Sequence, residues 1–312
     1  MNVPLVALTG ATGFIGRHLL KELPKRGYKI RVLLRRPTML PPEASGAVVG
    51  DLAAPRNMSD ALASVDAVIH SAGLAHAMSG RPEDDYRAIN TDATVGLARA
   101  AARAGVRRFV FLSSIRAQSG PVANEVLTED MEPRPTDAYG RSKLDAERGL
   151  ADVSIDWVAM RLVLVYGPGV KGNMAALVKL AAKPLPLPFR SLPGRHSLLS
   201  VDNLVVAVDT VLRAAAPLRR PLIVAEPEAL TLAEMITSLR RGLDRRPGLL
   251  PMPTPMLRSV FGMLGRSEAY ERIAGSLIVS AAALTALGWT PRVATRDGLA
   301  ALAGQAVGMG GG

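Results

Sequence analysis

The chain has 312 residues, of which 48% are hydrophobic, 21% are charged and only 4% are aromatic. This composition is typical of a globular protein whose core is built mainly from Leu, Val, Ile and Ala. The absence of cysteine excludes disulfides, thiolate catalysis and cysteine metal sites. The histidines form only one closely spaced pair, so no metal site is expected.

The formal net charge is +11. Nucleic-acid or anionic-membrane binding is one interpretation of such a charge. However, the basic residues are spread along the chain, which favours an arginine-rich surface or a site for an anionic substrate, and no nucleic-acid partner is expected. No uncharged apolar run reaches the roughly 18 residues of a membrane span. A first strand that begins at Val3 leaves no room for a signal peptide, so we expect no membrane partner and a cytoplasmic location.

Short apolar runs alternate with helical patterns through the first half of the chain, which predicts βαβ units and a parallel sheet. We expect strands at 3–9, 30–34, 47–49, 67–70, 108–112 and 155–165, and helices at 13–25, 58–63, 83–104 and 137–150.

A glycine-rich turn follows the first expected strand. Gly10, Gly13 and Gly16 have G-x-x-G-x-x-G spacing at a strand-to-helix junction. Gly10 permits the turn, Gly13 lets the backbone approach a diphosphate, and Gly16 allows close packing of the helix on the sheet. The start of the helix then offers free N–H groups to the phosphates. We expect this turn to bind a dinucleotide through Gly10, Thr12, Gly13, Phe14, Ile15 and Gly16.

The end of the second expected strand would meet the adenosine ribose. Enzymes that bind NAD usually place an acidic residue there, whereas this chain has Arg35 and Arg36. A guanidinium matches a 2′-phosphate, so these residues favour NADP, with NAD and a merely solvated arginine pair as the alternatives.

Two further segments follow strands at the edge where open α/β sheets bind ligands. Asp51 and Leu52 follow the third strand, and Asp51 could accept a hydrogen bond from the adenine amino group. Ala72 and Gly73 follow the fourth strand and would give the cofactor close access to the backbone. His70 is interpreted as a packed, hydrogen-bonded histidine rather than as a catalyst.

Tyr139 and Lys143 lie four residues apart near the start of an expected helix, with Thr136 or Asp137 as its N-cap, so both side chains share one face. A lysine ammonium and an oxidised nicotinamide both favour the tyrosinate, which suits Tyr139 to proton exchange during hydride transfer. Lys143 would also donate to the nicotinamide ribose. Ser113 and Ser114 end the fifth strand, where Ser114 is the expected catalytic serine and Ser113 a supporting residue expected to contact the cofactor.

Beyond Tyr166 the prolines cluster, which predicts a smaller and less regular lobe. We expect residues 1–165, with about 199–216, to form the nucleotide-binding domain. Residues 166–198 and 217–307 would form the substrate lobe, and 308–312 a disordered tail.

Together these residues resemble the extended short-chain dehydrogenase/reductase family, in its NAD-dependent epimerase/dehydratase branch. The resemblance rests on Thr9–Gly16, Asp51–Leu52, His70–Gly73, Ser113–Ser114, Tyr139-x-x-x-Lys143 and Arg161 through Gly169. It implies an α/β fold, in which a doubly wound parallel Rossmann sheet carries a smaller α/β substrate-binding lobe. It also implies a nucleotide-diphosphate sugar, expected to be UDP-linked, as substrate and a homodimer built from helices 83–104 and 137–150.

The same resemblance implies that Val163–Tyr166, including Val165, lies behind the nicotinamide ring. It also implies that Asn173 and Arg195 contact the substrate diphosphate and that Ser114 contacts the sugar. The chain departs from many relatives at His196, where they have Arg, and at Leu162-Val163, where they often have Pro.

Three functions remain open at this point. Ser114 is followed by Ile115-Arg116 instead of the Asp-Glu pair of the family's 4,6-dehydratases, which argues against a dehydratase. The favoured function is NADPH-dependent reduction of a UDP-4-keto, N-acetylated deoxy hexose for surface polysaccharides. The alternatives are a UDP-hexose or UDP-N-acetylhexosamine 4-epimerase with bound NAD, and a non-catalytic NADPH-binding regulator.

Overall fold

The computed structural model describes residues 3–74 and 82–308, and in these ranges seven parallel strands form the main sheet, in the order β3-β2-β1-β4-β5-β6-β9. From β1 the chain builds outward to one edge, then returns to β4 and builds toward the other edge. This is the doubly wound arrangement that the sequence predicts. The strands are β1 (Leu5–Thr9), β2 (Lys29–Leu34), β3 (Ala44–Val48), β4 (Ala67–His70), β5 (Arg108–Ser114), β6 (Asp156–Leu162) and β9 (Arg220–Val224).

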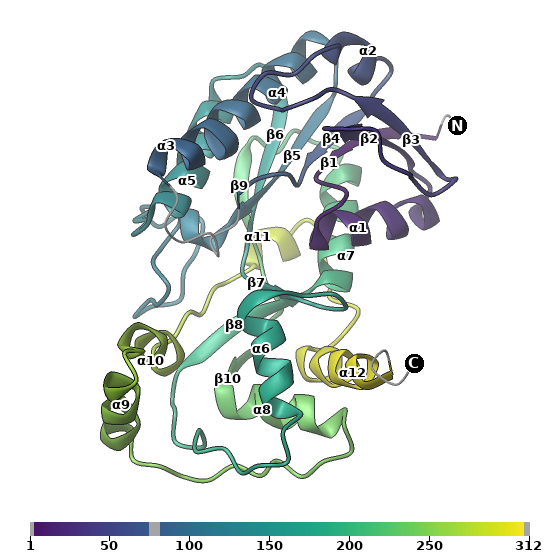
Figure 1. Ribbon diagram of the computed structural model, residues 1–312. Helices are drawn as coiled ribbons and strands as arrows, with labels where there is room; N and C mark the ends of the chain where they lie inside the picture. The colour runs from purple at the N-terminus through teal and green to yellow at the C-terminus, as the bar shows by residue number, and fades with distance from the viewer. Residues whose placement is uncertain (1–2, 75–81, 309–312) are drawn as a thin grey trace.

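Helices cover both faces of this sheet (Figure 1). One face packs on α1 (Phe14–Glu22) and α7 (Val201–Arg213), and the other packs on α2 (Met58–Leu62), α4 (Ala93–Arg103) and α5 (Ala138–Ala151). The central strands β1, β4, β5 and β6 are buried on both faces, which explains why they are mostly continuous apolar runs without alternation. Short segments complete this domain: η1 (Pro24–Arg26), α3 (Glu83–Tyr86), the π-helical η2 (Arg87–Asp92), η3 (Ile115–Ala117) and α11 (Ala282–Thr285).

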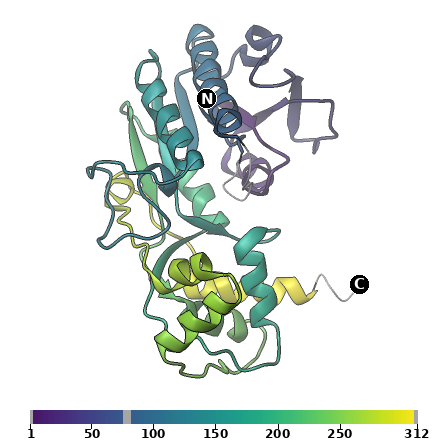
Figure 2. The same ribbon diagram turned by 60° about the vertical axis from the view of Figure 1, so that its left-hand side comes forward.

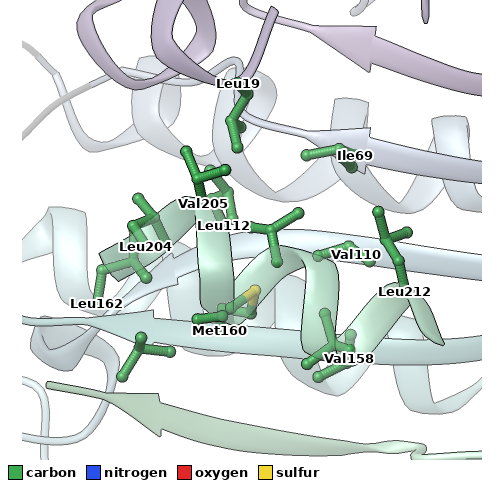
Figure 3. Packing of buried hydrophobic residues seen from close by; sticks show 14 of the residues in the cluster. Leu19, Ile69, Val110, Leu112, Val158, Met160, Leu162, Leu204, Val205 and Leu212 are labelled. Carbon is green, nitrogen blue, oxygen red and sulfur yellow. The ribbon is translucent and has the colours of Figure 1, made fainter. Parts of the chain in front are cut away.

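Aliphatic side chains from α1, the central strands and α7 interdigitate in the larger core cluster (Figure 3). Leu19 of α1, Val110 of β5 and Val205 of α7 are at most 1% exposed. Full burial of such a side chain contributes about 1.5–3 kcal/mol to folding, so this cluster fixes α1 and α7 against the sheet.

The smaller lobe contains, within the same described ranges, a sheet of three strands in the order β10-β8-β7. Its core packs α6, α8 and α12 on this sheet, and α9 and α10 lie on the side of the lobe away from α12 (Figure 1). The elements are β7 (Leu164–Tyr166), α6 (Gly172–Ala181), β8 (Arg195–Ser200), β10 (Ala229–Thr231), α8 (Leu232–Arg241), α9 (Thr254–Met263), α10 (Ser267–Ala274) and α12 (Thr295–Gly308). Among the helices of the described ranges, none combines the length and apolar character that crossing a bilayer requires.

The structure corrects four expectations. Two segments that were assigned to the lobe belong to the main domain: residues 220–224 form the edge strand of its sheet, and residues 282–285 form α11, which packs on its core. The single strand expected over 155–165 is divided between the two sheets. The helix expected over 83–104 is interrupted by η2. Gly308, expected in a disordered tail, ends α12, and residues 309–312 lie outside the described residues.

Arg108, a buried arginine at the start of β5, connects this strand to the C-terminal end of α7. Arg108 is 2% exposed and donates to the Asp156 carboxylate of β6 at 2.6 Å. Its other nitrogens donate to carbonyl oxygens at the end of α7 and just beyond, including those of Val211 at 2.5 Å and Ala214 at 2.8 Å. The guanidinium therefore caps α7 and pairs its charge at the same time.

We expect Arg108→Met to lower the free energy of unfolding by about 3–5 kcal/mol, because Asp156 would remain as a buried charge beside unpaired carbonyls. Urea denaturation measures this loss. The matched control is Arg56→Met, at an exposed position before α2, which should change stability by less than about 0.5 kcal/mol. Equal losses in the two variants would contradict this role of Arg108.

Candidate functional site

The turn between β1 and α1 leaves no room for side chains. Gly10 has φ +70°, and a Cβ there would lie 2.7 Å from the backbone nitrogen of Ala72. A Cβ on Gly16 would overlap the carbonyl oxygen of Gly10. Gly13 is the N-cap of α1 and contributes no capping side chain, so the first N–H groups of the helix are left for a ligand. These features fit the diphosphate of a dinucleotide, which binds closely to such a turn.

A cavity of about 600 Å³ extends from this turn along the carboxyl ends of β2 and β4. It contains residues that the sequence analysis assigned to the cofactor, together with Thr38 and Ile89, which that analysis did not identify. The assigned residues that line it are Gly10, Thr12, Arg35, Arg36, Asp51, Leu52, Ala72 and Gly73. Gly13, Phe14, Ile15 and Gly16 lie beside it at the start of α1.

Arg35 and Asp51 form an ion pair at the outer end of the cavity. The guanidinium Nη2 lies 3.2 Å from the carboxylate, and the side chains are 72% and 52% exposed. An ion pair so exposed contributes at most about 1 kcal/mol, so either partner can turn toward a ligand at little cost.

His70 has a structural role, as its sequence context predicts. Its ring nitrogens contact the hydroxyls of Thr9 at 2.8 Å and Thr94 at 3.0 Å. The Thr9 hydroxyl also accepts from the backbone nitrogens of Ser71 and Ala72, which holds the segment after β4 over β1. Burial, followed by the charge of Lys143, lowers the pKa of His70 to about 3, so the ring is neutral.

Asn90, in the π-helical η2, is a positioning residue that the sequence analysis missed. Its side-chain oxygen accepts from the backbone nitrogen of Leu74 at 2.8 Å, and its nitrogen donates to the Leu74 carbonyl oxygen and to the Ser142 hydroxyl. It therefore ties the segment after β4 to α5. The signal available in the sequence was the amide of Asn90, directly after Ile89, inside a segment expected to be helical.

Ser114 and Tyr139 come together from the end of β5 and the first turn of α5. Burial raises the pKa of the Tyr139 phenol, whereas its hydrogen bond with the Ser114 side chain lowers it. The Ser114 hydroxyl also accepts from the backbone nitrogen of Arg116 at 3.2 Å. The Tyr139 ring packs edge-on against Tyr86, with ring centroids 6.3 Å apart.

Lys143 lies one turn along α5 from Tyr139. Its ammonium donates to the Leu112 carbonyl oxygen at 3.1 Å and lies 4.5 Å from the centre of the Phe111 ring. It is 6.0 Å from the centre of the Tyr139 ring, and a Cβ on Gly73, at the edge of the cavity, would be 3.5 Å from it. Burial lowers the pKa of Lys143 to about 8, with Glu147 acting in the opposite direction. The Lys143 ammonium therefore lies between Gly73, at the edge of the cavity, and the Tyr139 ring.

A buried polar network below the site was not anticipated. The Ser113 hydroxyl donates to Glu147 at 2.5 Å, so this side chain points into the protein and supports the site from below. Arg161 donates to Glu147 at 2.6 Å and also to Gln118, and both ionic side chains are at most 4% exposed. Glu147 lies one turn after Lys143 on α5.

The start of α5 is capped by Asp137, one of the two expected candidates. Its Oδ1 accepts from the backbone nitrogen of Gly140 at 2.7 Å, and its Oδ2 accepts from Arg116 at 2.5 Å. Arg116 follows Ser114 in η3, so this ion pair fixes the serine-bearing segment to the tyrosine-bearing helix.

Asn173 and Arg195, which were expected to contact the substrate diphosphate, lie in the smaller lobe. Asn173 is exposed in the first turn of α6, where Lys171 is the N-cap. The Arg195 guanidinium is held by Glu234 at 3.1 Å and by the Ala229 carbonyl oxygen. His196 is largely buried, which lowers its pKa. Val165, expected behind the nicotinamide, lies on β7 and packs against the main core.

The described residues contain no group of three or more His, Asp or Glu side chains that could bind a metal ion.

Comparison with known proteins adds three findings. Residues 6–224 match the model of the NAD dependent epimerase/dehydratase family. A UDP-glucose 4-epimerase of Vibrio cholerae is 34% identical over 307 residues, which cover 94% of this chain and 92% of that protein. A ceramide reductase of Caulobacter vibrioides is 28% identical over 254 residues, or 80% of this chain and 74% of that protein.

Among solved structures, MoeE5 in complex with UDP-glucose and NAD has a TM-score of 0.73 and 29% identity. The similarity covers 97% of this chain and 99% of that chain. It therefore includes both the main domain and the smaller lobe.

We expect Gly16→Ala to weaken dinucleotide binding by at least about tenfold, because the new Cβ would push α1 away from the Gly10 carbonyl and displace the phosphate-facing N–H groups. Titration calorimetry with NAD and NADP measures the loss. Gly262→Ala is the matched control, since Gly262 is helical and a Cβ there has space. Unchanged dinucleotide affinity in Gly16→Ala would contradict this account of the turn.

His70 should make stability dependent on pH. Its folded pKa of about 3 is below the unfolded value of 6.5, so only the unfolded chain binds this proton between those values. The neutral ring therefore makes its full contribution to the free energy of unfolding above pH 6.5. As pH falls below that value, the free energy of unfolding decreases by up to about 1.4 kcal/mol per pH unit. Urea unfolding at a series of pH values should show a shallower dependence for His70→Gln than for the parent chain. Parallel curves would contradict the prediction.

Proposed function

Because the chain belongs to the NAD-dependent epimerase/dehydratase family, we propose that it is a UDP-hexose 4-epimerase that acts through Ser114, Tyr139 and Lys143. The observation that carries the proposal is the 34% identity with the Vibrio cholerae UDP-glucose 4-epimerase over nearly the whole of both chains. That identity extends through the smaller lobe, where the sequence analysis expects the sugar nucleotide.

In this proposal Tyr139 exchanges a proton with the hydroxyl at C4 of the sugar. A bound nicotinamide cofactor supplies the chemistry of accepting and returning hydride at that carbon. Ser114 holds the reacting oxygen in line with the phenol, in keeping with the hydrogen bond that joins the two side chains. General acid–base catalysis by a positioned phenol contributes roughly 10²–10⁴-fold to the rate.

Lys143 makes that proton transfer possible near neutral pH. Burial alone raises the pKa of Tyr139, which would keep the phenol protonated. The neighbouring ammonium favours the tyrosinate, and with a pKa of about 8 Lys143 is still largely charged at pH 7. Lys143 is also placed to donate to the ribose next to Gly73.

The diphosphate of the sugar nucleotide would lie at the start of α6. The first N–H groups there lack a capping side chain, and Asn173 adds an exposed amide. Arg195 would have to leave Glu234 to contribute, which gives Asn173 the larger role in this proposal.

A second candidate is an NADPH-dependent reductase of a UDP-4-ketosugar. It is favoured by Arg35 and Arg36, which line the cavity at the end of β2 where NAD-binding relatives usually carry an acid. Such an enzyme must exchange its cofactor after each turnover, whereas an epimerase gains from holding NAD tightly. We further propose that α4 and α5 form a homodimer interface and that the enzyme is cytoplasmic, as the sequence analysis expects.

One experiment distinguishes the two activities. The enzyme is incubated with UDP-glucose, UDP-galactose or UDP-N-acetylglucosamine, and with a UDP-4-ketosugar plus NADPH, while NMR follows the sugars and absorbance follows NADPH. Interconversion of C4 epimers with no net cofactor change supports the epimerase. Stoichiometric loss of NADPH with the ketosugar, without epimerisation, would replace it by the reductase.

We expect Tyr139→Phe to lower turnover by roughly 10²–10⁴-fold and to leave dinucleotide affinity nearly unchanged, because only the proton-transfer group is lost. The matched control is Tyr28→Phe, which removes a phenol that donates to Asp209 outside the site. Full activity in Tyr139→Phe would exclude the proposed chemistry, and absence of turnover in the parent chain would favour the non-catalytic regulator.

A further inference from the structure

Large apolar side chains are exposed together at the outer end of the smaller lobe. We define the distal surface as segments 183–190 and 245–250, helix α9 and residues 264–266. Leu185, Leu250, Met256, Met263 and Leu264 are between 52% and 81% exposed. Both views place the two segments and α9 at the end of the molecule away from the main sheet (Figures 1 and 2).

The two segments of the distal surface are joined by backbone hydrogen bonds. The backbone nitrogen of Leu187 donates to the carbonyl oxygen of Gly248 at 2.9 Å, and that of Leu250 donates to the carbonyl oxygen of Leu187 at 2.9 Å. Leu187 itself is buried. The exposed leucines therefore belong to a fixed part of the lobe, with their neighbours packed into its core.

Helix α9 has two apolar faces. Leu257 is 2% exposed and, with Phe261, packs against Tyr270 of α10. Met256 and Met263, seven residues apart, lie on another face and are exposed. One apolar face suffices to hold a surface helix on its domain, and the methionine face stays exposed among the residues that the structure describes.

The distal surface is also basic. The residues that define it contain no Asp or Glu and six Lys or Arg. Arg258 is paired with Glu271 of α10 at 3.0 Å, and Arg272 of α10 is paired with Glu268. The basic residues of the distal surface are Lys183, Arg190, Arg245, Arg246, Arg258 and Arg266.

We propose that the distal surface docks on an anionic lipid bilayer. Exposed Met and Leu side chains on a short amphipathic helix insert at the level of the headgroups, and surrounding arginines bind lipid phosphates. A second copy of the chain fits less well, because a symmetric contact would bring the same basic residues face to face. No membrane partner was expected from the sequence, because it has no apolar run long enough to span a bilayer and its basic residues are spread along the chain. The fold brings two segments without acidic residues onto one surface.

The test uses the full chain and vesicle co-sedimentation. Vesicles of phosphatidylcholine alone are compared with vesicles that also contain phosphatidylglycerol. We expect binding to the anionic vesicles only, weakened at least about tenfold when NaCl is raised from about 50 mM to about 500 mM, since salt screens exposed charges.

Two double variants separate the apolar and the charged contributions. Met263→Ser with Leu264→Ser, and Arg246→Gln with Arg266→Gln, change only exposed side chains and should each reduce vesicle binding at least about tenfold. The matched controls are Met39→Ser, at a methionine 97% exposed, and Lys29→Gln with Arg56→Gln, at exposed positions of the main domain, which should bind vesicles like the parent chain.

The proposal is overturned if anionic vesicles bind no better than neutral ones, or if the controls lose as much binding as the distal-surface variants. It is also overturned if sedimentation without lipid shows a dimer that Met263→Ser with Leu264→Ser abolishes. Turnover of soluble sugar nucleotides without vesicles is measured in parallel, so failure of membrane docking and failure of the proposed activity are read separately.

Discussion

The site depends on keeping one ammonium charged while it is buried. Lys143 is 5% exposed, and its direct contacts are a single carbonyl oxygen and the face of Phe111. Removal from water disfavours the charged form, and Glu147, one helical turn away, opposes that effect. Glu147 is in turn paired with Arg161. These three groups carry a net positive charge, which favours an anionic oxygen on Tyr139, so the catalytic property follows from how the buried charge is balanced.

The two parts of the molecule are joined through another buried carboxylate. Glu226 is 2% exposed and accepts from Asn203 of α7 at 2.6 Å, from the Ser200 backbone nitrogen at 2.8 Å and from the Tyr166 hydroxyl at 3.1 Å. These partners come from β7, from the junction of β8 with α7, and from α7 itself. A carboxylate that accepts several hydrogen bonds from separate elements holds them in one arrangement, which fixes the substrate lobe relative to the nucleotide-binding domain.

The fold could be predicted where the local sequence pattern of an element matches the burial of that element in the structure. The glycine turn, the apolar strands and the Tyr-x-x-x-Lys helix each carry their own signal, so their elements and order were predictable. Strand β9 was not, because Pro221 and two arginines precede its short apolar run. Pro is tolerated there because β9 is an edge strand, and only the assembled sheet reveals an edge. Asn90 and Glu147 were missed for a similar reason, since their partners are 16 and 34 residues away.

In the proposed function, cofactor choice and catalysis would be controlled at separate places. Arg35 and Asp51 form an exposed pair at the outer end of the cavity, and separating them costs at most about 1 kcal/mol. Arg35 can then turn to a 2′-phosphate while Asp51 faces the adenine, or the pair can remain closed beside a ribose hydroxyl. Lys143 lies beside Gly73, Tyr139 lies one helical turn before it, and neither is among the described residues that line the cavity with Arg35 and Asp51. A change in nucleotide preference at Arg35 would therefore leave the proton-transfer geometry intact, so the same catalytic residues can serve either an epimerase or a reductase.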